Sequence, residues 1–205
     1  MTTPSSSSSS SSSFALSRQA AGSMAQVSLF AALMAVMGLI PKIDLPLGVP
    51  ITIQSLGVML AGVMLGPWRG LQAMLLFLAA VAAGLPLLSG GRGGIGVFLS
   101  PSAGYLVGYA LAACIVGALM AALPQSTPKR TAFSAFVASL LGGLICLHAM
   151  GVLGLMHMAQ LSLAQAFKLT LAFVPGDLIK CILCTLIVHT VARGMPDWRF
   201  GGRHD

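Results

Sequence analysis

The stretch Pro175-Gly-Asp-Leu-Ile-Lys-Cys-Ile-Leu-Cys-Thr-Leu-Ile-Val188 lies in the last long apolar segment of the chain. Its charged side chains are Asp177 and Lys180, which are three residues apart and therefore share one face of a helix. Charges at membrane depth are costly, so such residues are rare and usually functional. Because the whole chain has four acidic residues, the position of Asp177 needs an explanation.

The composition around this stretch is that of a membrane protein. Of the 205 residues, 57% are hydrophobic and 7% are charged, whereas soluble domains carry about 25% charged residues. The net charge of +7 comes from basic residues that stand singly or in pairs between apolar runs. This pattern indicates control of membrane topology rather than binding of nucleic acid. We therefore expect an all-α integral membrane protein.

Six transmembrane helices are predicted from the uncharged runs, because a spanning helix needs about 20 apolar residues. They lie near residues 19–41, 51–67, 70–91, 101–122, 132–156 and from 171 or 175 to 191. A more polar segment, 158–170, predicts a short helix at the membrane interface. The domains are then a disordered serine-rich tail over 1–20, a membrane domain over 21–193 and a basic cytoplasmic tail over 194–205.

Loop charge predicts an N-in/C-in orientation, because basic residues concentrate on the cytoplasmic side. With both termini inside, seven Lys and Arg residues lie on the inner side, and Lys42, Arg92 and Lys168 lie outside. Asp177 and Lys180 then lie in the outer half of the last helix. The polar residues that need explaining converge on the outer side, which predicts an outward-facing ligand pocket.

Two interpretations of Asp177 and Lys180 are open. The pair can simply satisfy itself near the start of a helix. It can instead face a cavity, where an acceptor-only carboxylate and a donor-only ammonium suit a group with both N–H donors and a carbonyl, such as a urea. Arg92 lies in a glycine-rich outer loop, and either reaches a ligand carboxylate from there or has no specific role.

Three neutral residues are further candidates for the pocket lining. Thr52 and Gln54 open the second span, where they either contact a ligand or cap the helix start. Tyr105 either stacks on a ligand ring or anchors the helix at the interface.

Other sites are not predicted. His148, His157 and His189 do not form a metal-ligand spacing, and are interpreted as packing or interface residues. The sequence has no G-x-x-x-x-G-K-[ST] motif, so the chain itself is not expected to hydrolyse ATP.

Several motifs together resemble the BioY family, the biotin-binding S components of energy-coupling-factor (ECF) vitamin transporters. They are Pro50-Ile-Thr-Ile-Gln-Ser-Leu-Gly-Val-Met-Leu-Ala-Gly-Val-Met-Leu-Gly-Pro67, Gly84-Leu-Pro86, Gly104-Tyr105 and Pro175-Gly-Asp-Leu-Ile-Lys180. The resemblance covers residues 24–193. One departure is Ser100-Pro-Ser-Ala-Gly-Tyr105, where Gly-Pro-Thr-Gly-Gly-Tyr is usual.

The resemblance implies a non-enzymatic substrate-binding subunit with six helices in the bacterial inner membrane. Its ligand is biotin, with no cofactor and no metal. Asp177 and Lys180 match the family's polar pair and Arg92 its outer-loop arginine, while Thr52, Gln54 and Tyr105 lie in matching motifs.

Helix 1 is implied to be a docking element. Ala31 and Ala35 match an Ala-x-x-x-Ala face that docks on a transmembrane coupling subunit. ATP is hydrolysed in such transporters by separate ATPase subunits. Two alternatives stay open: an S component for another vitamin, and a structural helical membrane protein that uses the Asp–Lys pair for assembly.

Overall fold

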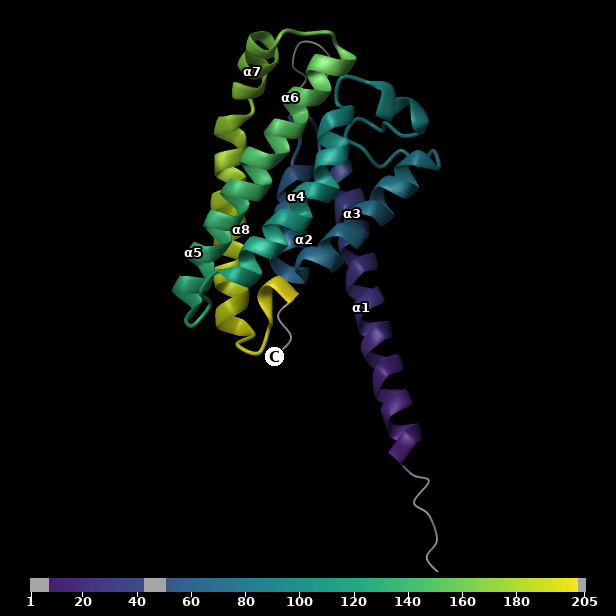
Figure 1. Ribbon diagram of the computed structural model, residues 1–205, viewed down its shortest axis with the longest axis vertical. Coiled ribbons are helices and arrows are strands. Elements are labelled where there is room, and N and C mark those ends of the chain that lie inside the picture. The colour runs from purple at the N-terminus through teal and green to yellow at the C-terminus, as the bar shows by residue number, and fades with distance from the viewer. Residues whose placement is uncertain (1–7, 43–50, 203–205) are drawn as a thin grey trace, which may run out of the picture.

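A computed structural model describes the backbone of residues 8–42 and 51–202, and the side chains from residue 21 onward (Figure 1). Eight α-helices are described: α1 (Ser8–Gly38), α2 (Gln54–Leu65), α3 (Pro67–Ala82), α4 (Ala103–Ala122), α5 (Pro128–Ala138), α6 (Leu147–Met158), α7 (Leu163–Leu171) and α8 (Val174–Gly194). A π-helical segment, Ser139–Cys146, joins α5 to α6 without a break. Leu88 and Arg92 form an antiparallel β-bridge.

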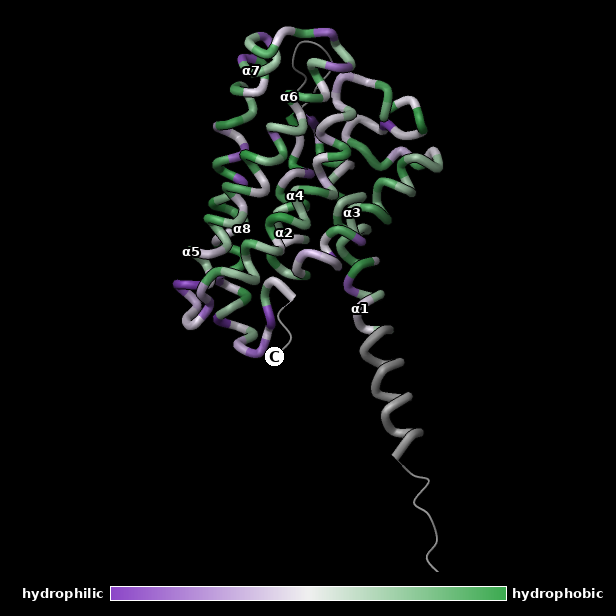
Figure 2. Tube along the Cα trace, in the orientation of Figure 1, coloured by the Kyte–Doolittle hydropathy of each residue, from purple (hydrophilic) through white to green (hydrophobic). Residues whose placement is uncertain are grey.

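The all-helical prediction is confirmed. Four helical segments are long and apolar enough to cross a membrane: 21–38, 103–122, 128–158 and 174–194. Figure 2 shows hydrophobic residues along these helices and hydrophilic ones gathered toward the ends of the bundle. Large apolar side chains such as Ile179, Ile182 and Leu186 of α8 are exposed, as expected of helices that face lipid.

The second predicted span ends where the sequence predicts, at Gly66 and Pro67, whereas the third ends earlier than predicted. Helices α2 and α3 have 12 and 16 residues, which at 1.5 Å per residue gives about 18 and 24 Å. The break between them comes at Gly66, whose φ of 83° is left-handed, and at Pro67, which starts α3. The chain after Ala82 then forms a loop over residues 83–102 instead of extending the third span.

The predicted tails over 1–20 and 194–205 stay predictions, although the structure describes part of each. Helix α1 begins at Ser8, so it includes much of the serine-rich segment that was predicted to be disordered; residues 1–7 lie outside the described residues. The basic tail folds back as far as Gly202. There Phe200 is buried, and a Cβ added at Gly201 would lie 2.6 Å from the amide nitrogen of Ala121.

Helix α4 occupies the centre of the bundle and packs against α2, α3 and α6. Its contact with α6 is made through glycines: a Cβ added at Gly104 would lie 2.7 Å from the Cα of Gly154. Small residues at a helix crossing let two backbones approach closely. The close approach of α4 and α6 therefore depends on the absence of a side chain at this crossing.

Replacing Gly104 with leucine is expected to destabilise the bundle by about 1–3 kcal/mol, because overpacking forces the two backbones apart. Thermal unfolding of the purified protein in detergent measures the effect. Gly22→Leu is the matched control, since a Cβ at Gly22 meets nothing within 4 Å. Equal melting temperatures for the two variants would show that α4 and α6 can move apart at this crossing without loss of stability.

Candidate functional site

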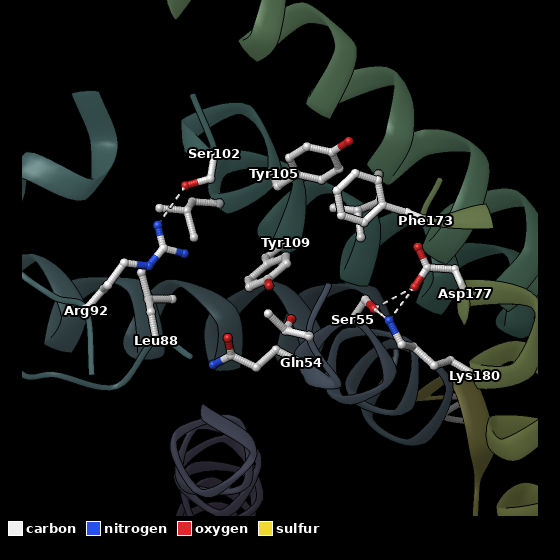
Figure 3. Close-up of a pocket in the computed structure, with 13 residues that line it drawn as sticks. Gln54, Ser55, Leu88, Arg92, Ser102, Tyr105, Tyr109, Phe173, Asp177 and Lys180 are labelled. Atoms are coloured by element: carbon white, nitrogen blue, oxygen red, sulfur yellow. Dashed lines mark hydrogen bonds and ion pairs between the residues drawn. The ribbon is translucent and has the colours of Figure 1, made fainter. Parts of the chain in front are cut away.

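A cavity lies between α2, α4, α8 and the loop over residues 83–102 (Figure 3). Its apolar wall contains Leu88, Leu106, Leu147 and Phe173. Its polar lining comprises Thr52, Gln54, Ser55, Arg92, Ser102, Tyr105, Tyr109, Asp177 and Lys180. All six residues predicted to bind substrate thus meet at one cavity, although they come from four separate parts of the chain.

One end of the cavity is formed by a buried ionic cluster of α8 and α2. Lys180 Nζ lies 2.6 Å from Asp177 Oδ1 and donates to the Ser55 hydroxyl at 2.9 Å. The Ser55 hydroxyl in turn donates to Asp177 Oδ1 at 3.0 Å. Asp177 is 4% exposed and Lys180 is 9% exposed, so neither charge is compensated by bulk water. The pair satisfies itself and faces the cavity, which combines the two interpretations left open by the sequence.

His148 is a member of this cluster that sequence reasoning missed. Its Nε2 lies 3.3 Å from Asp177 Oδ2. The contact is close but is not aligned as a hydrogen bond, and both ring nitrogens are buried without a hydrogen-bond partner. The sequence did contain one indication of such a role, which is a polar imidazole side chain within an apolar helical segment. Helical spacing could not place it, because the π-helical segment that precedes it changes the register.

The opposite end of the cavity is formed by Arg92. Its Nε donates to the Ser89 carbonyl and its Nη1 to the Ser102 hydroxyl, both at 3.4 Å. The loop turns back through Gly90 and Gly91, whose φ values of 82° and 69° favour glycine. Backbone bonds between Leu88 and Arg92, at 3.0 and 3.2 Å, close this turn. Figure 3 shows Arg92 across the cavity from Asp177 and Lys180.

Gln54 is held by the backbone. The side chain is 1% exposed, and its Nε2 donates to the Met34 carbonyl at 3.2 Å and the Leu87 carbonyl at 3.1 Å. Its Oε1 accepts from the Ser89 hydroxyl at 3.4 Å. Both amide hydrogens are therefore engaged, and the residue ties the Arg92 loop to α1 and α2.

Thr52 and Tyr105 also line the cavity. Thr52 does not cap α2, whose N-cap is Ile53 with no side-chain cap hydrogen bond. The Tyr105 hydroxyl is 3.2 Å from the Thr170 hydroxyl. Tyr105 therefore has its ring, more than its hydroxyl, available to a ligand.

The predicted docking residues on α1 face the interior. Ala31 is 8% exposed and belongs to the core that α1 forms with α3 and α2, and Ala35 is half-buried against the same core. The exposed face of α1 carries larger side chains, including Leu29 and Val36. The role of Ala31 and Ala35 in docking stays a prediction.

Comparison with known proteins finds similar chains of known family. The biotin transporter BioY of Rhodobacter capsulatus is 44% identical over 83% of this chain and 93% of its own. The biotin transporter BioY of Rhizobium etli is 46% identical over 82% of this chain and 92% of its own. A crystal structure of the S component for biotin from an ECF-type ABC transporter superposes with a TM-score of 0.78. It is 31% identical and covers 86% of this chain and 93% of that one.

The family model matches most of the chain. It is the model of the BioY family, and it aligns with residues 6–197, which include both ends of the cavity. The chain belongs to the BioY family.

Proposed function

We propose that this chain binds biotin and takes it up as the substrate-specific component of an ECF-type transporter. One observation supports the ligand most directly: the cavity has a carboxylate–ammonium pair at one end and a guanidinium at the other. Biotin has the matching order of groups, with a ureido ring, an apolar thioether ring and a carboxylate on an alkyl chain. The family membership and the fold are consistent with this ligand.

The chemistry of the two ends assigns their roles. The Asp177 carboxylate accepts the ureido N–H bonds, and Lys180 donates to the ureido oxygen. Arg92 pairs with the ligand carboxylate. Tyr105, with Phe173, supplies ring surface for the apolar part of the ligand. Thr52 completes the lining, while Gln54 keeps the Arg92 loop in place.

The membrane arrangement that fits this function has six crossings, with both termini in the cytoplasm and the cavity opening outward. Helices α2 and α3, although short, complete the six with the four longer segments. The protein then lies in the bacterial inner membrane. Separate coupling and ATPase subunits drive the transport, and no cofactor is needed.

Asp177→Asn and Lys180→Ala are each expected to weaken biotin binding about 10- to 100-fold, because each removes a hydrogen bond to a charged group and leaves its partner buried and unpaired. Biotin titration of the purified protein by calorimetry measures the loss. Lys168→Ala is the matched control, since Lys168 is exposed on α7. Unchanged affinity in both site variants would contradict the site. Tight binding of a different vitamin in the same assay would correct the ligand.

Arg92→Gln is expected to weaken biotin about tenfold or more while leaving biotin methyl ester nearly unchanged, because the ester has no charge for the guanidinium to pair with. Parallel titrations of the two ligands measure the difference. If Lys180→Ala gives this selectivity instead, the assignment of the two cations is reversed.

Ala35→Trp tests the docking of α1 on a coupling subunit. The variant is expected to bind biotin normally, while ATP-driven uptake falls to the level of cells without the coupling subunit, because the bulky ring blocks close helix contact. Radiolabelled biotin uptake and binding are compared. Ile182→Trp, on the exposed face of α8, should leave both intact. Loss of binding together with uptake in Ala35→Trp would mean that the residue serves internal packing.

A further inference from the structure

The buried imidazole of His148 has a position that packing alone does not explain. It is 7% exposed, and neither Nδ1 nor Nε2 has a hydrogen-bond partner. A buried polar group without a partner costs about as much as a lost hydrogen bond, so each one in a native protein needs a reason. An apolar side chain would fill this space without that cost.

The surroundings of the ring point to the reason. The ring stands edge-on to Tyr105 and Phe173, with centroid distances of 6.2 Å to each. These two aromatic side chains also line the cavity. The ring is therefore confined on two sides, and its Nε2 lies 3.3 Å from Asp177 Oδ2.

The two oxygens of the Asp177 carboxylate differ in their partners. Lys180 and Ser55 both contact Oδ1, whereas the contact of His148 is to Oδ2. Without His148, the carboxylate would be held at one oxygen and could swing about its Cβ–Cγ bond. A ligand N–H would then have to fix the orientation of the group that accepts it, which reduces affinity.

We propose that His148 is a positioning residue for biotin recognition. A slight rotation of the ring on ligand binding aligns its Nε2–H with Asp177 Oδ2, as hydrogen bonds in a site often tighten only in the complex. This bond then keeps the remaining lone pairs of the carboxylate pointed into the cavity. His148 itself does not line the cavity, so it acts on the ligand through Asp177. This inference rests on the proposed function and adds a residue to the ureido end of the site.

The π-helical segment explains how His148 comes to face α8. Residues 139–146 follow i to i+5 hydrogen bonding, which places more residues in each turn than an α-helix and so rotates the residues after it about the helix axis. Gly142 and Gly143 allow the wider turn to lie against Val116 of α4 and Met59 of α2. His148 comes two residues after this segment, with its ring turned toward Asp177.

Two substitutions of His148 distinguish the contribution of its N–H donor to biotin affinity from that of the packing of its ring. His148→Phe keeps an aromatic ring against Tyr105 and Phe173 but has no N–H. It is expected to weaken biotin about 10- to 100-fold, as the loss of a hydrogen bond to a charged group does. His148→Gln places an amide nitrogen near the position of Nε2, and its affinity should return to within about threefold of the wild type. His157→Phe is the control, because His157 is exposed near the end of the same helix.

The outcomes distinguish the possible failures. Biotin affinity and melting temperature are measured for each variant in detergent, and His148→Leu serves as the second donor-free variant if His148→Phe does not fold. Wild-type affinity in a donor-free variant overturns the inference. Weak binding that His148→Gln does not restore also overturns it, because the ring's packing would then be what matters. If the wild-type protein does not bind biotin, the proposed function fails first.

Discussion

The buried carboxylate of Asp177 is the group on which the organisation of this site depends. A charge removed from water must be compensated by nearby partners, because breaking such a pair leaves an uncompensated charge that costs several kcal/mol. Here the partners come from three helices: Lys180 from α8 itself, Ser55 from α2 and His148 from α6. Compensating one charge therefore fixes the relative positions of three helices that are far apart in the sequence.

The cavity exists because the rest of the bundle is tightly packed around it. Glycines bring α4 close to α6 at Gly104 and Gly154, and the same helix passes close to α2 at Gly62. The loop over residues 83–102 closes the site from the side of α3, and Gln54 anchors it with both amide hydrogens. Rigid supports of this kind place the two charged ends of the site without help from the ligand, which preserves binding free energy.

Predictions from the sequence were accurate for features that are encoded within a single helical segment. The helical segments were found, including the short helix α7, because apolar runs are local signals. The six residues predicted to bind substrate line one cavity, because isolated charges in or beside apolar runs are local signals too. Sequence reasoning was less accurate for the third span, because α3 ends at Ala82 and the chain enters a loop instead of continuing to residue 91. It also failed to identify His148, whose role depends on a π-helical register that apolar spacing does not encode.

The amino-acid sequence by itself determined the class of the protein, its helices and the charged residues of its site, because hydrophobicity and the cost of burying charge act on each segment separately. Only the tertiary structure decided the partners of those charges. It placed Arg92 across the cavity from Asp177, turned Ala31 toward the core and engaged Gln54 with backbone carbonyls. These outcomes depend on the relative rotation of packed helices, which is set by contacts between residues distant in the chain. The stretch from Pro175 to Val188 therefore shows that a buried carboxylate, Asp177, is present. The folded bundle shows which residues compensate its charge.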